Sequence, residues 1–241
     1  MNETKNTISE LNKYGFLIIN TIYNISEVKK IINYIENLDS NNPIFRKTDD
    51  IFAIRQFIKE FPQIKEIIFN ENLKKIINNI GGENCFVIKS IYFDKPEKSN
   101  WFVSYHQDLT ISVDKKEMID GYNFWTNKHN QFAVQPTLDI LENIFTIRIH
   151  LDDTNEENGA LKIIEKSHLK SIRRIENMDL NMEKETFCNV NSGGIMIMKP
   201  LLFHSSMRTT NNKKRRVLHI EFSNKELPNK INWSEYSKIF N

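Results

Sequence analysis

The N-terminal third of the chain spaces its hydrophobic residues with a helical period. After Asn24, with Glu27 three positions later as in a capping box, apolar residues recur every three or four positions. A second stretch of this kind covers 71–80, between Asn70 as the expected N-cap and a pair of glycines. The pattern predicts a mostly helical N-terminal part, residues 1–82, whose apolar helix faces need a surface to cover.

After residue 82 the period changes to the two-residue alternation of β-strands. Short runs rich in β-branched and aromatic residues, separated by turn-like pairs, cover 85–93, 144–153, 160–165, 194–199 and 215–222. They predict a mainly β fold over 83–224, an antiparallel jelly-roll barrel of two sheets with the N-terminal helices packed on one sheet. We expect the insertion 113–136 to act as a lid, and 225–241 to form a C-terminal tail.

Two of the predicted strands have one apolar and one polar face. In the run 144–153, Arg148 and His150 lie opposite four apolar residues. In the last run, Arg215 and His219 share the polar face and Arg216 falls on the apolar one. If helices cover the apolar faces, the polar faces line the barrel interior, where buried arginines need an anion. Alternation alone leaves open the reverse arrangement, with the polar faces toward solvent.

Composition narrows the class of protein. At about 150 residues per domain, 241 residues fit a single domain spanning 1–241. The formal net charge of +2, from 33 basic and 31 acidic side chains, gives no general field for nucleic acid or an anionic membrane. No apolar run reaches the length of about 18 residues expected of a membrane span. The glycines form neither a GxGxxG nor a P-loop pattern, which excludes the common glycine-loop nucleotide sites.

The cysteines and the N-terminal segment indicate a compartment. Cys85 and Cys188 lie far apart inside apolar runs, so we expect reduced, buried thiols and no disulfide. The N-terminal segment is polar and lacks the apolar region of a secretory signal. Together these features predict a cytoplasmic protein, whereas nothing in the sequence indicates its oligomeric state.

A candidate metal site begins at His106-Gln107-Asp108. On an extended strand, residues i and i+2 point to the same side about 6 to 7 Å apart, so an imidazole and a carboxylate can bind one ion. His204, where a later strand ends, offers a third ligand, and Arg215 offers a cation for an anionic cosubstrate. Two histidines and one carboxylate leave three octahedral positions open, as in non-haem Fe(II) oxygenases, whereas zinc more often has a fourth protein ligand.

In order and spacing, these motifs resemble those of the phytanoyl-CoA dioxygenase family of Fe(II)/2-oxoglutarate oxygenases. The resemblance rests on HQD, TIRIHLDD, EENGALKIIEKSH, KPLLFHSS and RRVLHIEF, and covers about 89–222. It implies a double-stranded β-helix, a cupin-like jelly roll, in which His106, Asp108 and His204 hold Fe(II). It also implies that Arg215 binds the far carboxylate of 2-oxoglutarate. Family members usually read PGSH where this chain has EKSH, a departure that concerns the shape of that loop and not the metal site.

The resemblance points to two more basic residues as cofactor-binding candidates. Many relatives carry an apolar aromatic residue at the position of Arg148, so an arginine there gives the cosubstrate a second cation or binds an acidic substrate. A salt bridge from Arg148 to Asp152 or Glu221 is the structural alternative. Lys89 lies where relatives place a residue near 2-oxoglutarate, and its structural alternative is a solvated strand lysine.

These residues predict an Fe(II)- and 2-oxoglutarate-dependent dioxygenase that uses O2 on a small molecule and forms succinate and CO2. Because halogenases of related fold replace the acidic ligand with a small residue, Asp108 favours hydroxylation. Basic interior groups favour a substrate with a carboxylate or phosphate, and we expect neither nucleic acid nor membrane as a partner. The alternatives are a non-catalytic, metal-containing cupin-like protein that binds a small molecule, and an interaction protein built on an oxygenase scaffold.

Overall fold

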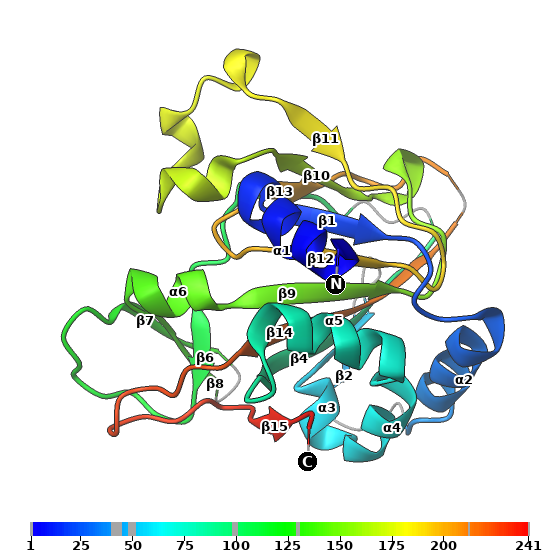
Figure 1. The fold of residues 1–241 in the computed structure, drawn as a ribbon, viewed down its shortest axis with the longest axis horizontal. Coiled ribbons are helices and arrows are strands. Elements are labelled where there is room, and N and C mark those ends of the chain that lie inside the picture. Colours follow the sequence, from blue (N-terminus) through cyan, green and yellow to red (C-terminus); the bar gives the residue numbers. More distant parts are fainter. Residues whose placement is uncertain are drawn as a thin grey trace.

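Helices gather in the N-terminal part of the chain and strands make up most of the remainder (Figure 1). The computed structural model describes residues 2–39, 45–47, 52–97, 101–128, 131–211 and 213–240. The helices are α1 Asn2–Tyr14, α2 Ile25–Glu36, α3 Phe57–Glu60, α4 Lys65–Ile68, α5 Glu71–Gly81 and α6 Leu138–Asn143, with short 3-10 helices at Pro62–Ile64, Glu156–Asn158, Ser167–Lys170, Ile175–Asn177 and Leu180–Met182. Within these described ranges, no helix is long and apolar enough to cross a membrane.

A large antiparallel sheet has the strand order β1-β12-β9-β14-β4-β3-β2, and β15 pairs with β4 beside this path. Its strands are β1 Phe16–Ile19, β2 Phe45–Lys47, β3 Phe52–Arg55, β4 Phe86–Lys95, β9 Phe145–His150, β12 Ile195–Met198, β14 Arg215–Ser223 and β15 Ser237–Lys238. Because β14 lies between β9 and β4, His219 stands opposite Arg148, and Glu221 opposite both Thr146 and Lys89. This register brings the polar residues of three strands onto one face of the sheet.

The helices α1 to α5 cover the other face of this sheet (Figure 1). Ile147 and Leu218, from the apolar faces of β9 and β14, share one buried cluster with Leu73 of α5. The predicted capping box starts α2, since Asn24 Oδ1 accepts from Glu27 N at 3.0 Å and Glu27 Oε2 accepts from Asn24 N at 2.8 Å. The helices therefore bury the apolar faces, which leaves the polar faces of β9 and β14 directed into the barrel.

A smaller sheet closes the barrel on the polar side, with strand order β11-β10-β13-β5. Its strands are β5 Val103–His106, β10 Leu161–Ile164, β11 Glu185–Phe187 and β13 His204–Ser206. Between the two sheets, Leu161 and Ile163 of β10 pack with Met196 and Met198 of β12. The architecture confirms the predicted mainly β double-stranded β-helix with its N-terminal helices on one sheet.

The insertion 113–136 and the preceding strand make a small sheet of their own. It contains β6 Ile111–Val113, β7 Asn123–Lys128 and β8 Gln131–Gln135 in the order β6-β8-β7, while residues 129 and 130 lie outside the described ranges. Tyr122 and Val134 pack in one buried cluster with Trp233 of the C-terminal tail and Ile88 of β4. The insertion is thus anchored through its apolar face, and its movement as a lid stays a prediction.

The C-terminal tail binds to the same part of β4 and to α3. Its strand β15 pairs with the start of β4, and the Glu235 side chain just before it is 2% exposed. One oxygen of Glu235 accepts from Ser90 N at 2.7 Å, and the other accepts from Lys59 N at 3.2 Å and from the Ser90 hydroxyl. Burial raises the pKa of Glu235 to about 7. The tail is therefore fixed by a buried carboxyl group.

The N-terminal part contains strands that the sequence pattern did not reveal. β1 pairs with β12, with Phe16 opposite Met198, and β3 pairs with β4, with Ile54 opposite Tyr92. These strands read FLII and FAIR, too short to show a two-residue period, and the helical pattern around them dominates. Their partners in the large sheet supply the hydrogen bonds, so tertiary pairing decides their conformation.

Candidate active site

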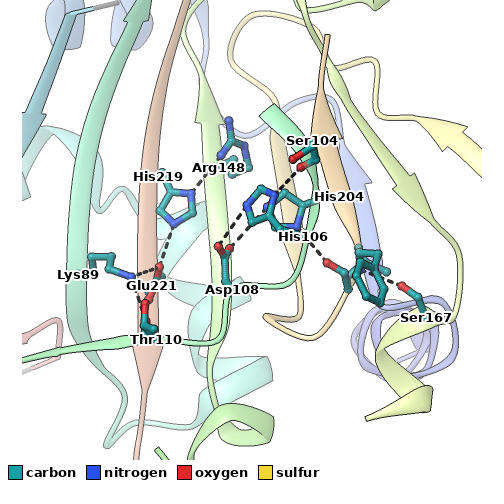
Figure 2. A network of polar contacts seen from close by, with 12 residues as sticks. Lys89, Ser104, His106, Asp108, Thr110, Arg148, Ser167, His204, His219 and Glu221 are labelled. Atoms are coloured by element: carbon teal, nitrogen blue, oxygen red, sulfur yellow. Dashed lines mark hydrogen bonds and ion pairs between the residues drawn. The ribbon is translucent and has the colours of Figure 1, made fainter. Parts of the chain in front are cut away.

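The predicted metal ligands meet at the edge of the smaller sheet (Figure 2). His106 ends β5 and His204 begins β13, and the antiparallel pairing of these strands places the two histidines directly opposite each other. Their ring centroids are 4.2 Å apart. The carboxylate of Asp108 lies between the rings, with His106 Nε2 3.7 Å from Oδ1 and His204 Nε2 3.7 Å from Oδ2. The structure therefore brings together all three residues expected to bind the metal.

Backbone carbonyls set the tautomer of both histidines. His106 Nδ1 lies 2.9 Å from Ser104 O, and His204 Nδ1 lies 2.9 Å from Leu202 O. Because a carbonyl only accepts, each Nδ1 carries the proton and each Nε2 presents its lone pair toward Asp108. The Oδ2 atom of Asp108 is buried without a hydrogen-bond partner among the described residues. Two imidazole lone pairs and an unpaired carboxylate oxygen facing one point fit a divalent metal ion.

The electrostatics of the site keep the ligands in their metal-binding forms. Burial opposes ionisation of Asp108, but the neighbouring histidines and Lys89 outweigh it and lower the pKa of Asp108 to about 2. Burial lowers the pKa of His204 to about 4, so this ring is neutral at physiological pH. An ionised carboxylate and a neutral imidazole are the protonation states that bind a metal without first losing a proton.

Gln107, between the two ligands of the HQD turn, holds this turn in place. Its amide nitrogen donates to Leu201 O at 2.7 Å and to Ser171 O at 2.9 Å, and its amide oxygen accepts from Arg173 N at 2.9 Å. Asp108 N in turn donates to Pro200 O at 2.9 Å. These bonds join the HQD turn to the loop before His204, so they fix the distance between the ligands. The sequence carries no signal for this role, and Gln107 was not among the predicted site residues.

A chain of polar contacts runs beside the metal ligands, from Lys89 through Glu221 and His219 to Arg148 (Figure 2). Lys89 Nζ lies 2.8 Å from Glu221 Oε1, His219 Nε2 lies 3.1 Å from the same oxygen, and Arg148 Nη1 lies 3.0 Å from His219 Nδ1. Since arginine only donates, His219 Nδ1 accepts and its Nε2 carries the proton given to Glu221. Asp108, His219 and Glu221 are close enough to form a second metal-binding set, but these contacts already engage both nitrogens of His219.

The contacts of Arg148 and Lys89 differ from the structural alternatives considered for them, a salt bridge for Arg148 and a solvated side chain for Lys89. Arg148 is 7% exposed and forms no salt bridge with Asp152 or Glu221, because Asp152 pairs with Arg216 at 2.7 Å and Glu221 pairs with Lys89. The Lys89 side chain is 20% exposed and ion-paired, so it is not a solvated strand lysine. Glu221 was not among the predicted site residues, although alternation had placed it on the face of His219.

Arg215 lies farther along the same inner face and has no carboxylate partner in the described parts of the chain. It is 3% exposed, its Nη1 donates to Gly159 O, and its Nε has no partner among the described residues. Burial, with Arg148 nearby, lowers the pKa of Arg215 to about 9, which leaves it charged at neutral pH. Gly159 has a φ of +81°, and a Cβ there would lie 2.7 Å from Lys95 Nζ, so this position requires glycine. The arginine is thus a buried cation that an anionic ligand would neutralise.

The sequence was compared with known families and proteins. The profile of the phytanoyl-CoA dioxygenase (PhyH) family matches residues 11–217. A search of curated proteins finds no match.

Solved structures with the same fold include several non-haem enzymes. The 2-oxoglutarate-dependent epimerase SnoN from nogalamycin biosynthesis superposes with a TM-score of 0.69 at 10% identity, over 92% of this chain and 82% of that chain. The carbocyclase SnoK from the same biosynthesis superposes with a TM-score of 0.67 at 15% identity, over 91% of this chain and 83% of that chain. HygX from Streptomyces hygroscopicus, with nickel and 2-oxoglutarate bound, gives 0.65 at 14% identity, over 92% and 86% of the two chains. At these identities the likeness shows a shared fold.

Proposed function

Because this chain belongs to the phytanoyl-CoA dioxygenase family, we propose that it is an oxygenase that hydroxylates a C–H bond of a small molecule. The family uses Fe(II), 2-oxoglutarate and O2, the cofactors predicted from the sequence. One observation carries the proposal: two imidazole lone pairs and an unpaired carboxylate oxygen, from His106, His204 and Asp108, face a common point. This donor set fits a ferrous ion with positions left for further ligands.

The protein contributes binding and orientation to this reaction. When bound, the iron with 2-oxoglutarate and O2 supplies the oxidising chemistry, and succinate and CO2 are released. His106, Asp108 and His204 would hold the ion, while Gln107 keeps their turn against the loop before His204. Arg215 would bind the far carboxylate of 2-oxoglutarate, because it is a buried cation without an acidic partner among the described residues. Hydrophobic packing of β10 against β12 closes one side of the barrel interior to water.

The acidic ligand bears on the type of oxidation. Halogenases of related fold have a small residue in place of this carboxylate, so Asp108 supports hydroxylation over halogenation. The structural neighbours include an epimerase and a carbocyclase, and their reactions make product analysis part of the test. A product with one added oxygen supports hydroxylation, whereas an isomer or a product with a new carbocyclic ring would replace this part of the proposal.

The first experiment measures succinate formed from 2-oxoglutarate under air with added Fe(II). We expect turnover by the unchanged protein, loss of turnover with a metal chelator, and loss in Asp108→Ala. The control Asp120→Ala makes the same chemical change at an exposed position and should behave as the unchanged protein. Full turnover in Asp108→Ala would contradict the metal assignment. Binding of metal and 2-oxoglutarate without succinate formation under any substrate screen would instead favour a small-molecule binding protein.

The second experiment tests the cosubstrate position by calorimetry of the Ni(II)-loaded protein. Arg215→Gln should weaken 2-oxoglutarate binding about tenfold or more, the loss expected when a charge-assisted hydrogen bond is removed. Arg216→Gln is the matched control, because Arg216 lies on the opposite face and pairs with Asp152 at 2.7 Å. Equal affinities of the two variants for 2-oxoglutarate would contradict the role of Arg215.

Lys89 remains a candidate for the cosubstrate site, and its ion pair supports an indirect role. With Glu221 at 2.8 Å, Lys89 keeps positive charge close to Asp108 and helps to lower the pKa of that carboxyl group. We also propose a cytoplasmic location, which the free and buried thiols of Cys85 and Cys188 support.

A further inference from the structure

Arg148 is a buried cation beside the metal ligands that the proposed reaction does not use. It lies on the inner face of β9, 7% exposed, and burial lowers its pKa to about 10, so it stays charged at neutral pH. Its Nη1 donates to His219, while its Nε has no partner among the described residues (Figure 2). A buried guanidinium bonded only to a neutral ring is costly unless a further acceptor binds it.

The acidic groups near Arg148 are already engaged. Glu221 pairs with Lys89 at 2.8 Å and accepts from His219 at 3.1 Å. Asp108 is the negative charge that acts on Arg148, but it faces His106 and His204 as the expected metal ligand. The nearby thiol of Cys188 is uncharged, because burial raises its pKa to about 12.

The sum of the charges on the inner side chains shows which cation lacks a counter-ion. From the metal ligands to Arg215, the inward-facing charged side chains among the described residues are positive at Lys89, Lys95, Arg148 and Arg215 and negative at Asp108 and Glu221, so the sum is +4 − 2 = +2. Fe(II) carries +2 and 2-oxoglutarate −2, so their joint binding leaves this sum unchanged. Lys89 is paired with Glu221, Arg215 would balance the far carboxylate of 2-oxoglutarate, and Asp108 with the near carboxylate would balance the ion. Lys95 stands opposite Arg215 and donates to Met207 O, so Arg148 is the cation left over beside the metal ligands.

On the basis of the function proposed above, we propose that the substrate carries a carboxylate group and that Arg148 binds it. A guanidinium binds a carboxylate through charge-assisted hydrogen bonds, and Arg148 has donors that His219 does not use. One carboxylate matches the single charge of Arg148, whereas a dianionic phosphate would add a second negative charge that this guanidinium does not balance. The contact would also fix the oxidised C–H near the metal, because Arg148 lies close enough to act on both Asp108 and His204.

The experiment uses formate as a minimal carboxylate and formamide as its neutral counterpart. The protein is loaded with Mn(II) and saturated with 2-oxoglutarate, and the paramagnetic broadening of the probe's C–H proton resonance is measured by NMR. We expect broadening of formate and not of formamide. In Arg148→Gln the affinity for formate should fall about tenfold or more, while Arg148→Lys should retain part of it. Arg216→Gln should match the unchanged protein.

Calorimetry of 2-oxoglutarate on the same Mn(II)-loaded proteins separates the outcomes. Unchanged 2-oxoglutarate affinity in Arg148→Gln, together with loss of formate binding, supports the proposal. The proposal is overturned if the unchanged protein shows no broadening of formate, or if the broadening is equal in the unchanged protein and Arg148→Gln. Loss of 2-oxoglutarate binding in Arg148→Gln also overturns it, because Arg148 would then serve the cosubstrate, and the proposed function would stand. Failure of the unchanged protein to bind 2-oxoglutarate would refute both.

Discussion

The ionisation of the buried Glu235 carboxyl group can be measured through the pH dependence of the free energy of unfolding. Burial raises its pKa from 4.5 to about 7, because the side chain is 2% exposed between α3 and β4. At about 1.4 kcal/mol per unit of pKa, this difference corresponds to about 3 kcal/mol in the free energy of unfolding. Since the folded state holds the proton more tightly than the unfolded state, this stabilisation is fully present below about pH 4.5. It is lost as the pH rises to about 7.

The assay is urea unfolding from pH 4.5 to 8, with a chelator present so that metal binding does not contribute. Glu235→Gln keeps the shape of the protonated acid, so its unfolding free energy should lack this pH-dependent loss. Relative to the variant, the unchanged protein should lose about 3 kcal/mol across the interval. Glu226→Gln is the control, because Glu226 is an exposed carboxylate of the same tail. Parallel pH profiles of the unchanged protein and Glu235→Gln would refute the reasoning.

Further predictions concern the positions that support the site and the fold. Gln107→Ala removes three hydrogen bonds from the HQD turn and should lower Mn(II) affinity about tenfold, measured by calorimetry. Gly159→Ala places a Cβ 2.8 Å from Met207 O at a φ of +81° and should cost about 1 to 3 kcal/mol, with weaker 2-oxoglutarate binding, because Gly159 O accepts from Arg215. Asn24→Ala removes the α2 cap and should cost about 1 kcal/mol in urea unfolding. An unchanged affinity or midpoint would contradict the corresponding prediction.

The sequence predicted the site residues whose signals are local. His106 and Asp108 stand two positions apart, and the alternation along β14 separates Arg215 from Arg216, as the structure has them. The alignment of His204 with His106 was not readable, because β5 and β13 are four and three residues long and show no period of their own. His204 was predicted as the third ligand because it follows a predicted strand, and the resemblance to the family implied the same residue.

Contacts that depend on strand register could not be predicted. Lys89 meets Glu221 because β4 pairs with β14, and a bulge between Glu221 and Phe222 sets which residues stand opposite each other. Arg148 meets His219 through the pairing of β9 with β14. Alternation gave the face of each side chain, but the partner depends on how far one strand is shifted along the next.

The position of the two histidines has a consequence beyond catalysis. Strand β5 forms the border of the smaller sheet and pairs only with β13 among the described strands, and His106 and His204 face each other across that pairing. An ion bound by both side chains would cross-link the edge strand β5 to its neighbour β13. Removing the ion would then loosen β5 and expose the hydrogen-bonding groups of β13 to other chains, so iron supply would influence aggregation as well as turnover.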